Sequence, residues 1–269
     1  MQETIKASLS IRIVCALSIL VAALGAFIGS GALGGTPIAE AADGRLGADA
    51  TLLAPGTGAF AIWSFIYTAL VVYAIWQMTP RASMSPTQMR IRSLAAASAI
   101  LNALWIFTVQ LGFLALSVVV IVVLLVVLIM MFKRMLSPRP SRFELWLMAI
   151  TFGPYLGWVS VATIANIAAW LSSMGVGNQA AWAPALACVL VVVAALIGAM
   201  TVLFSRGRVA TALAMTWGIA WIGIGRSDGG LESPAVAMTA FGAAAALLLL
   251  VVVAAVRRIA KYRMDGAML

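Results

Sequence analysis

Residues 154–170 read PYLGWVSVATIANIAAW. The stretch is apolar enough to be part of a membrane-spanning helix, which needs about 20 predominantly apolar residues. It nevertheless carries aromatic and uncharged polar side chains, among them Trp158, Ser160, Thr163 and Asn166. Leu, Ile and Val alone would hold a span in lipid, so these additional side chains indicate either close helix packing or a binding site.

The composition of the whole chain places it in a membrane. Of its 269 residues, 64% are hydrophobic and only 9% are charged, and the mean hydropathy is +1.10. A soluble domain is about 45–50% apolar and about 25% charged. The sequence therefore predicts an all-α fold, a polytopic bundle of membrane-spanning helices.

Eight apolar runs are long enough to be read as membrane helices. They lie near residues 11–33, 58–78, 92–112, 114–133, 144–171, 181–204, 208–225 and 234–256. A long connection, 34–57, separates the first two. The segment AEA at 39–41 is compatible with signal-peptide cleavage, but the first run exceeds the 7–15 residues typical of a signal core. We therefore expect this helix to be retained.

Basic residues predict the orientation of the chain. If the N-terminus is cytoplasmic, 15 of the 17 basic residues fall on the cytoplasmic side, and only Arg45 and Arg226 lie opposite. The 15 are Lys6, Arg12, Arg81, Arg90, Arg92, Lys133, Arg134, Arg139, Arg142, Arg206, Arg208, Arg257, Arg258, Lys261 and Arg263. This bias follows the positive-inside rule. It predicts cytoplasmic N- and C-termini, and it accounts for the net charge of +9 through the lipid bilayer, with no nucleic acid as partner.

Several kinds of chemistry have no residues to support them. The chain contains no histidine, which removes imidazole metal sites and His-dependent catalysis. Cys15 and Cys188 lie in apolar runs and are expected to be buried. No Asp, Glu, Lys or Arg falls securely at the middle of a predicted span, where such groups usually mark ion or proton paths. We therefore expect no metal, no covalent cofactor, no catalytic residues and no enzyme activity.

Aromatic and amide side chains recur at helical spacing in three of the predicted spans. Trp63 and Tyr67 are four residues apart, and Asn102 and Trp105 are three apart, so each pair shares a helix face. Trp217 and Trp221 form a similar pair in the seventh run. Such faces are compatible with two interpretations, which are helix packing and a pocket for a flat hydrophobic ligand.

The helix predicted around residues 154–170 has a comparable face. Projected at 100° per residue, Trp158 lies beside Ala162, Ala165 and Ala169, and Asn166 lies at the edge of this face, about 80° from Trp158. Tryptophans near the ends of runs have a simpler explanation as anchors at the membrane interface. These are Trp76, Trp146, Trp170 and Trp182.

Three motifs in the same order resemble those of the tryptophan-rich sensory protein family (TspO and the mitochondrial translocator protein). PYLGWVSVATIANIAAW resembles the signature of the family's fifth helix, APGTGAFAIWSFIY at 54–67 resembles the opening of its second, and LNALW at 101–105 resembles its third-helix motif. The resemblance covers roughly residues 10–172. The chain continues beyond the fifth helix, and in this it is similar to a longer, eight-helix bacterial branch.

The resemblance implies a domain organisation and a site. Residues 1–172 would form a five-helix core with the long loop 34–57 as a lid, and residues 173–269 would add three helices and a short basic tail. The family binds porphyrins and other hydrophobic molecules in a pocket under this loop. Carried onto this chain, the pocket between the second, third and fifth helices would be lined by Trp63, Tyr67, Asn102, Trp105, Tyr155, Trp158, Ala162 and Asn166.

The sequence thus predicts a receptor or carrier for a planar hydrophobic molecule, with a porphyrin or another tetrapyrrole as the best-supported ligand. The location implied by the resemblance is the bacterial inner membrane. Two alternatives stay open at this point, a facilitated transporter of a hydrophobic metabolite or lipid, and a scaffold subunit of a larger membrane complex. A homodimer and a membrane-complex partner are both compatible with the sequence.

Overall fold

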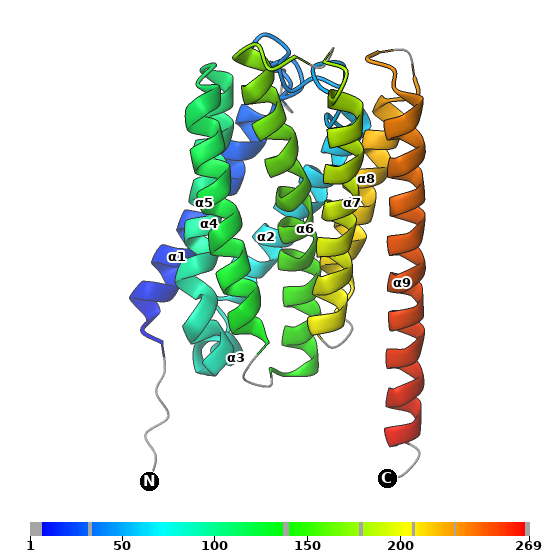
Figure 1. Cartoon of the computed structure of the whole chain (residues 1–269). Coiled ribbons are helices and arrows are strands. Elements are labelled where there is room, and N and C mark those ends of the chain that lie inside the picture. Colours follow the sequence, from blue (N-terminus) through cyan, green and yellow to red (C-terminus); the bar gives the residue numbers. More distant parts are fainter. Residues whose placement is uncertain are drawn as a thin grey trace. The chain divides into compact units, whose positions relative to one another are not determined.

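A computed structural model of the chain describes residues 7–31, 34–136, 140–177, 180–205, 208–228 and 230–266, with the backbone only for residues 259 and 261–266. Throughout these residues, the regular elements are helical (Figure 1). They are α1 (Leu9–Gly29), the 3-10 helix η1 (Thr57–Ala61), α2 (Ile62–Trp76), α3 (Pro80–Met84), α4 (Pro86–Gln110), α5 (Leu114–Met135), α6 (Arg142–Ser173), α7 (Ala183–Phe204), α8 (Ala210–Gly225) and α9 (Pro234–Gly266). The predicted all-α membrane fold is confirmed.

Each of the eight predicted apolar runs contains a helix, but one helix is shorter than expected. Seven helical segments in the described parts of the chain are long and apolar enough to cross a membrane. The run predicted at 208–225 forms α8, which has only 16 residues. At 1.5 Å per residue it extends about 24 Å, less than the roughly 30 Å of a bilayer's hydrocarbon core.

Helix boundaries follow capping residues in the sequence. The Oγ of Ser8 accepts a hydrogen bond from the Ile11 amide at the start of α1. Ser85 caps α4 in the same way, accepting from the Gln88 amide at 3.3 Å, and Pro86 occupies the first turn of that helix. Proline suits this position because the first amides of a helix have no partner within it. These short polar segments separate apolar runs that would otherwise merge.

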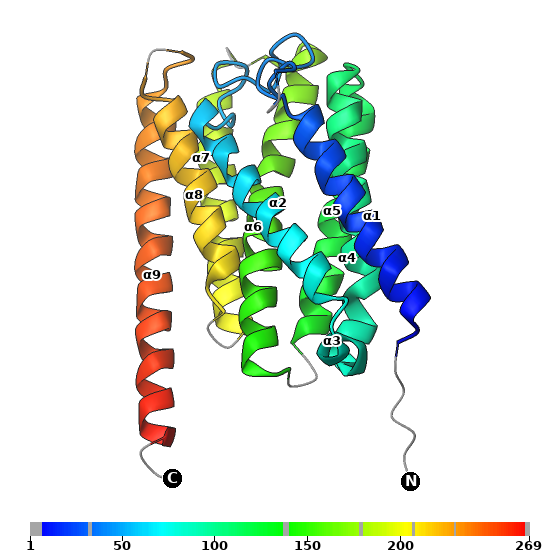
Figure 2. The same cartoon turned by 180° about the vertical axis from the view of Figure 1, so that it is seen from behind.

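The chain divides into two compact units, each of which is described separately. Unit 1 contains residues 1–46 and 60–152, and unit 2 contains residues 47–59 and 153–269. The boundary therefore passes through the predicted lid, with 34–46 in unit 1 and 47–57 in unit 2, and also through α6. In unit 1, α1 packs against α2 and α4, and α4 packs against α5 (Figure 2).

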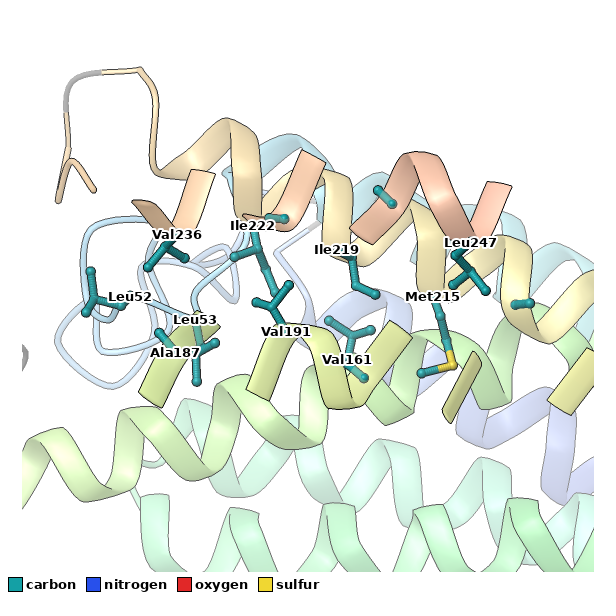
Figure 3. Close-up of a cluster of buried hydrophobic side chains, with 14 of the residues drawn as sticks. Leu52, Leu53, Val161, Ala187, Val191, Met215, Ile219, Ile222, Val236 and Leu247 are labelled. Carbon is teal, nitrogen blue, oxygen red and sulfur yellow. The ribbon is translucent and has the colours of Figure 1, made fainter. Parts of the chain in front are cut away.

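Unit 2 is organised around a buried apolar cluster. Helices α7, α8 and α9 pack against one another, and Val161 of α6 joins them. Leu52 and Leu53, from the segment before η1, also belong to this cluster, where they lie at the end marked by Val236 and Ala187 (Figure 3). This segment is therefore part of the hydrophobic core of unit 2.

The contact of α6 with α8 depends on small residues. A Cβ atom added to Gly157 would lie 2.2 Å from the carbonyl oxygen of Thr211 and 2.8 Å from the Cβ of Ala214. One added to Gly153 would lie 2.5 Å from the Cβ of Ala210. Close approach of this kind is typical of membrane helices that pack through small residues.

Candidate functional site

Four of the eight predicted site residues lie together in unit 1. Trp63 and Tyr67 of α2 stack with ring centroids 5.4 Å apart and planes inclined by 13°. Trp105 of α4 contacts Trp63, and the centroids of their rings are 6.0 Å apart. All three aromatic residues are buried. The three rings therefore form one buried apolar cluster between α2 and α4.

Asn102 adds a polar group to this aromatic cluster. Its Nδ2 donates a hydrogen bond of 3.1 Å to the hydroxyl of Tyr67, and the residue is only 1% exposed. Among the residues that the structure describes, no donor lies within hydrogen-bonding distance of Asn102 Oδ1. A buried amide oxygen without a hydrogen-bond donor lowers the stability of the folded protein. It is also suited to accept a hydrogen bond from a bound molecule.

The other four predicted site residues lie on α6, in the part of the helix that belongs to unit 2. Tyr155, Trp158 and Asn166 are buried, and Ala162 is half-buried. The structure thus brings Trp63, Tyr67, Asn102 and Trp105 together, and it places the α6 residues on one helix of the other unit.

Two polar side chains of the stretch 154–170 form hydrogen bonds with the backbone of their own helix, α6. The Oγ of Ser160 donates to the carbonyl oxygen of Leu156 at 2.8 Å, and the Oγ1 of Thr163 donates to that of Val159 at 2.7 Å. Ser and Thr commonly bond to the carbonyl four residues earlier in this way. Their presence in an apolar helix therefore requires no ligand.

A buried hydrogen-bond network in unit 1 was not predicted from the sequence. The Oε1 of Glu144, at the start of α6, accepts from Ser85 Oγ at 2.6 Å and from Gln88 Nε2 at 2.7 Å. The hydroxyl of Tyr73 donates to Gln88 Oε1 at 2.7 Å. Glu144, Gln88 and Tyr73 are all buried. The network therefore joins α2, α4 and α6 at one end of the unit.

The same network contains Arg92, one of the 15 basic residues that the sequence predicts on the cytoplasmic side. Arg92 is buried within α4. Its Nε donates to Gln77 Oε1 at 2.6 Å, and a terminal nitrogen donates to the carbonyl oxygen of Ala82 at 2.9 Å. The sequence feature that could have indicated this network is the pair Gln77 and Gln88, eleven residues apart. Two amides beside apolar runs indicate a polar contact between helices.

Arg226, one of the two basic residues predicted on the side opposite the cytoplasm, is also buried. It follows α8 directly and is 1% exposed. Its guanidinium donates to the carbonyl oxygen of Thr51 at 2.7 Å and to that of Ala48. Burial lowers the pKa of this guanidinium from its ordinary value, while the charges of Asp228 and Asp49 oppose the shift.

Two tryptophans of α8 contact the same segment. The Nε1 of Trp217 donates to the carbonyl oxygen of Ala59 at 3.1 Å, and the backbone of Trp221 accepts from the Gly56 amide at 2.9 Å. The two indoles lie edge to face with centroids 5.6 Å apart. The sequence singled out this pair by its spacing, but only the structure connects it with residues 47–59.

The predicted interfacial tryptophans differ in exposure. Trp146 is 70% exposed and Trp182 is 54% exposed, as an anchor among lipid headgroups requires. Trp76 is half-buried and packs against Tyr73 and Phe143 of its own unit. Lys6, Arg139 and Arg206 lie outside the described residues, as do the side chains of Lys261 and Arg263.

The seven apolar spans and the buried aromatic and amide groups define a multi-pass helical membrane protein with polar groups enclosed between its helices. The model of the TSPO-like protein family matches residues 12–253. The chain therefore belongs to this family, and the match extends well beyond the first five predicted spans. No curated protein and no solved structure matches the chain significantly.

Proposed function

We propose that this TSPO-like membrane protein is a receptor or carrier that binds a planar hydrophobic molecule, with a tetrapyrrole as the ligand class. The observation that carries the proposal is the group formed by Trp63, Tyr67, Trp105 and Asn102. Three stacked or tilted rings offer a flat apolar surface, and Asn102 Oδ1 is a buried acceptor beside them, with no donor among the described residues.

A tetrapyrrole matches both properties of this group. Its ring is flat and apolar, so it can stack on the indoles, and a protonated propionic acid group at its edge can donate to an amide oxygen. Pockets for such molecules are mostly apolar with a few placed polar groups. Tyr155, Trp158, Ala162 and Asn166, which the resemblance implies as further site residues, stay a prediction, and we propose binding without catalysis.

Titration of the purified protein with protoporphyrin IX, followed by quenching of tryptophan fluorescence, tests the proposal. Asn102→Leu keeps the approximate volume but removes the acceptor, so we expect affinity to fall about five- to tenfold, as for one lost hydrogen bond. Trp63→Ala removes the stacking surface and should weaken binding further. Trp146→Phe, at an exposed position, is the control. Unchanged affinity in both site variants contradicts the assignment.

We also propose that the protein lies in the bacterial inner membrane with both termini in the cytoplasm. The distribution of basic residues supports this orientation. Among described side chains, Lys133 and Arg134 lie in the last turn of α5, and Arg257 and Arg258 lie near the end of α9. Asp43, Asp49 and Glu232 are exposed in the loops predicted to face outward.

A further inference from the structure

The two halves of the long loop are held by different parts of the chain. In unit 1, the side chain of Gln110 donates to the carbonyl oxygens of Gly29 and Thr36 at 2.7 and 2.8 Å, which fastens the beginning of the loop. In unit 2, residues 51–56 are all buried, and α8 holds the segment 47–59. The later half of the loop thus packs against α8, a helix outside the five-helix core predicted from the resemblance.

The fit between Trp221 and this segment depends on glycine. A Cβ atom added to Gly58 would lie 2.2 Å from Cη2 of Trp221, and one added to Gly56 would lie 3.0 Å from its Cε3. The indole therefore lies directly against the backbone of the segment. Since Gly58 does not have a positive φ, its small size, and not an unusual backbone conformation, is what this contact requires.

Arg226 forms hydrogen bonds with the beginning of the same segment, at Ala48 and Thr51. It bonds to the carbonyl oxygens of Ala48 and Thr51, beside which Leu52 and Leu53 enter the apolar cluster of unit 2. A lysine has a single ammonium group and lacks the planar fork with which a guanidinium reaches two acceptors. The backbone of residues 48–53 is therefore held by charge-assisted hydrogen bonds as well as by burial.

Trp217 also contacts the start of the helical segment that carries Trp63 and Tyr67 of the proposed ligand site. The carbonyl oxygen of Ala59 accepts from Trp217, and Ala59 is four residues before Trp63 in the continuous helical segment formed by η1 and α2. The contact thus connects α8 to the site through the chain itself.

We propose that Trp217, Trp221 and Arg226, here called the α8 clasp, hold residues 47–59 in place and, through the chain that continues from η1 into α2, control how long the ligand is retained. The effect on ligand retention rests on the proposed function. The holding of residues 47–59 by α8 does not depend on it. The clasp assigns a role to α8, for which the five-helix core offers no counterpart. The three residues are positioning residues. A protein in which their contacts with residues 47–59 are broken should release its ligand faster.

Hydrogen exchange of residues 47–59 in the ligand-free, full-length protein tests the structural part. Gly58→Ala introduces the clash with Trp221, so we expect exchange in this segment to accelerate about tenfold. Trp221→Leu should accelerate it as well. In the Trp221→Leu background, Gly58→Ala should add little, because the clash is with the indole. Gly242→Ala, on α9 with nothing within 4 Å of the added atom, is the matched control.

Release of bound protoporphyrin IX after dilution, followed by its fluorescence, tests the functional part. We expect release to accelerate in Gly58→Ala and in Arg226→Lys in parallel with exchange. Unchanged exchange in Gly58→Ala overturns the clasp. Faster exchange with unchanged release overturns its control of the ligand. If the unaltered protein binds no protoporphyrin, the proposed function fails, and the exchange data still decide whether the clasp holds the segment.

Discussion

At the scale of single residues, the position of a polar side chain in an apolar helix does not reveal its role. Ser160 and Thr163 bond to carbonyls of their own helix, whereas Glu144 accepts from two side chains of neighbouring segments. Asn102 differs from both groups, because one end of its amide is bonded and the other has no donor among the described residues. Only this last condition points towards a ligand.

Glu144→Ala should destabilise the protein. The substitution leaves the donors of Ser85 and Gln88 buried without their acceptor, and hydrogen bonds to a charged group contribute about 1.5–3 kcal/mol. We expect the free energy of unfolding in detergent to fall by about this amount. Glu40→Ala, at an exposed position, is the control. An equal effect of the two substitutions would show that the network contributes no stability.

At the scale of elements, glycine determines how closely the helices of unit 2 can approach. Gly153 and Gly157 are four residues apart on α6 and both face α8. Gly218 of α8 faces Val161 at 3.0 Å from the position of an added Cβ. Three contacts along one pair of helices therefore depend on the absence of a side chain. In lipid, where apolar side chains gain little by leaving the solvent, such packing is a main source of helix association.

Gly157→Ala should weaken this pair of helices. The new methyl group would overlap the carbonyl oxygen of Thr211, and overpacking of this kind costs about 1–3 kcal/mol. We expect a lower midpoint of thermal unfolding in detergent. The same substitution at Gly242, where the added atom meets nothing, should leave the midpoint unchanged or raise it slightly, since alanine favours a helix. Equal midpoints for the two variants would contradict close packing at Gly157.

At the scale of the whole molecule, the main question is whether the short helix α8 crosses the membrane. An even number of spans puts both termini on one side, as the distribution of basic residues predicts. A helix of 16 residues can span if the bilayer thins locally or if flanking residues extend the crossing. We therefore expect α8 to cross, with Arg226 and the loop to α9 on the external side.

Labelling of single cysteines with a membrane-impermeant maleimide, in a cysteine-free background, decides the topology. Asp43→Cys and Glu232→Cys should react in intact cells from the periplasmic side, while Arg134→Cys and Arg257→Cys should react only after the membrane is opened. All four positions are exposed in the structure. Protection of Glu232→Cys in intact cells would mean that α8 does not span.

The sequence by itself determined the fold class, the helices and the family, because hydrophobic length and motif order are local properties of the chain. It also predicted that Trp63 and Tyr67, and Asn102 and Trp105, share helix faces, because 3.6 residues complete a helical turn. Only the tertiary structure decided which polar groups are buried and what they contact. Arg92 lies within α4 and Arg226 directly follows α8, and at both positions the sequence pattern is the same for a solvated cation and for a buried one. Their hydrogen bonds go to residues 10 to 178 positions away, and such distant contacts leave no periodic signal in the sequence.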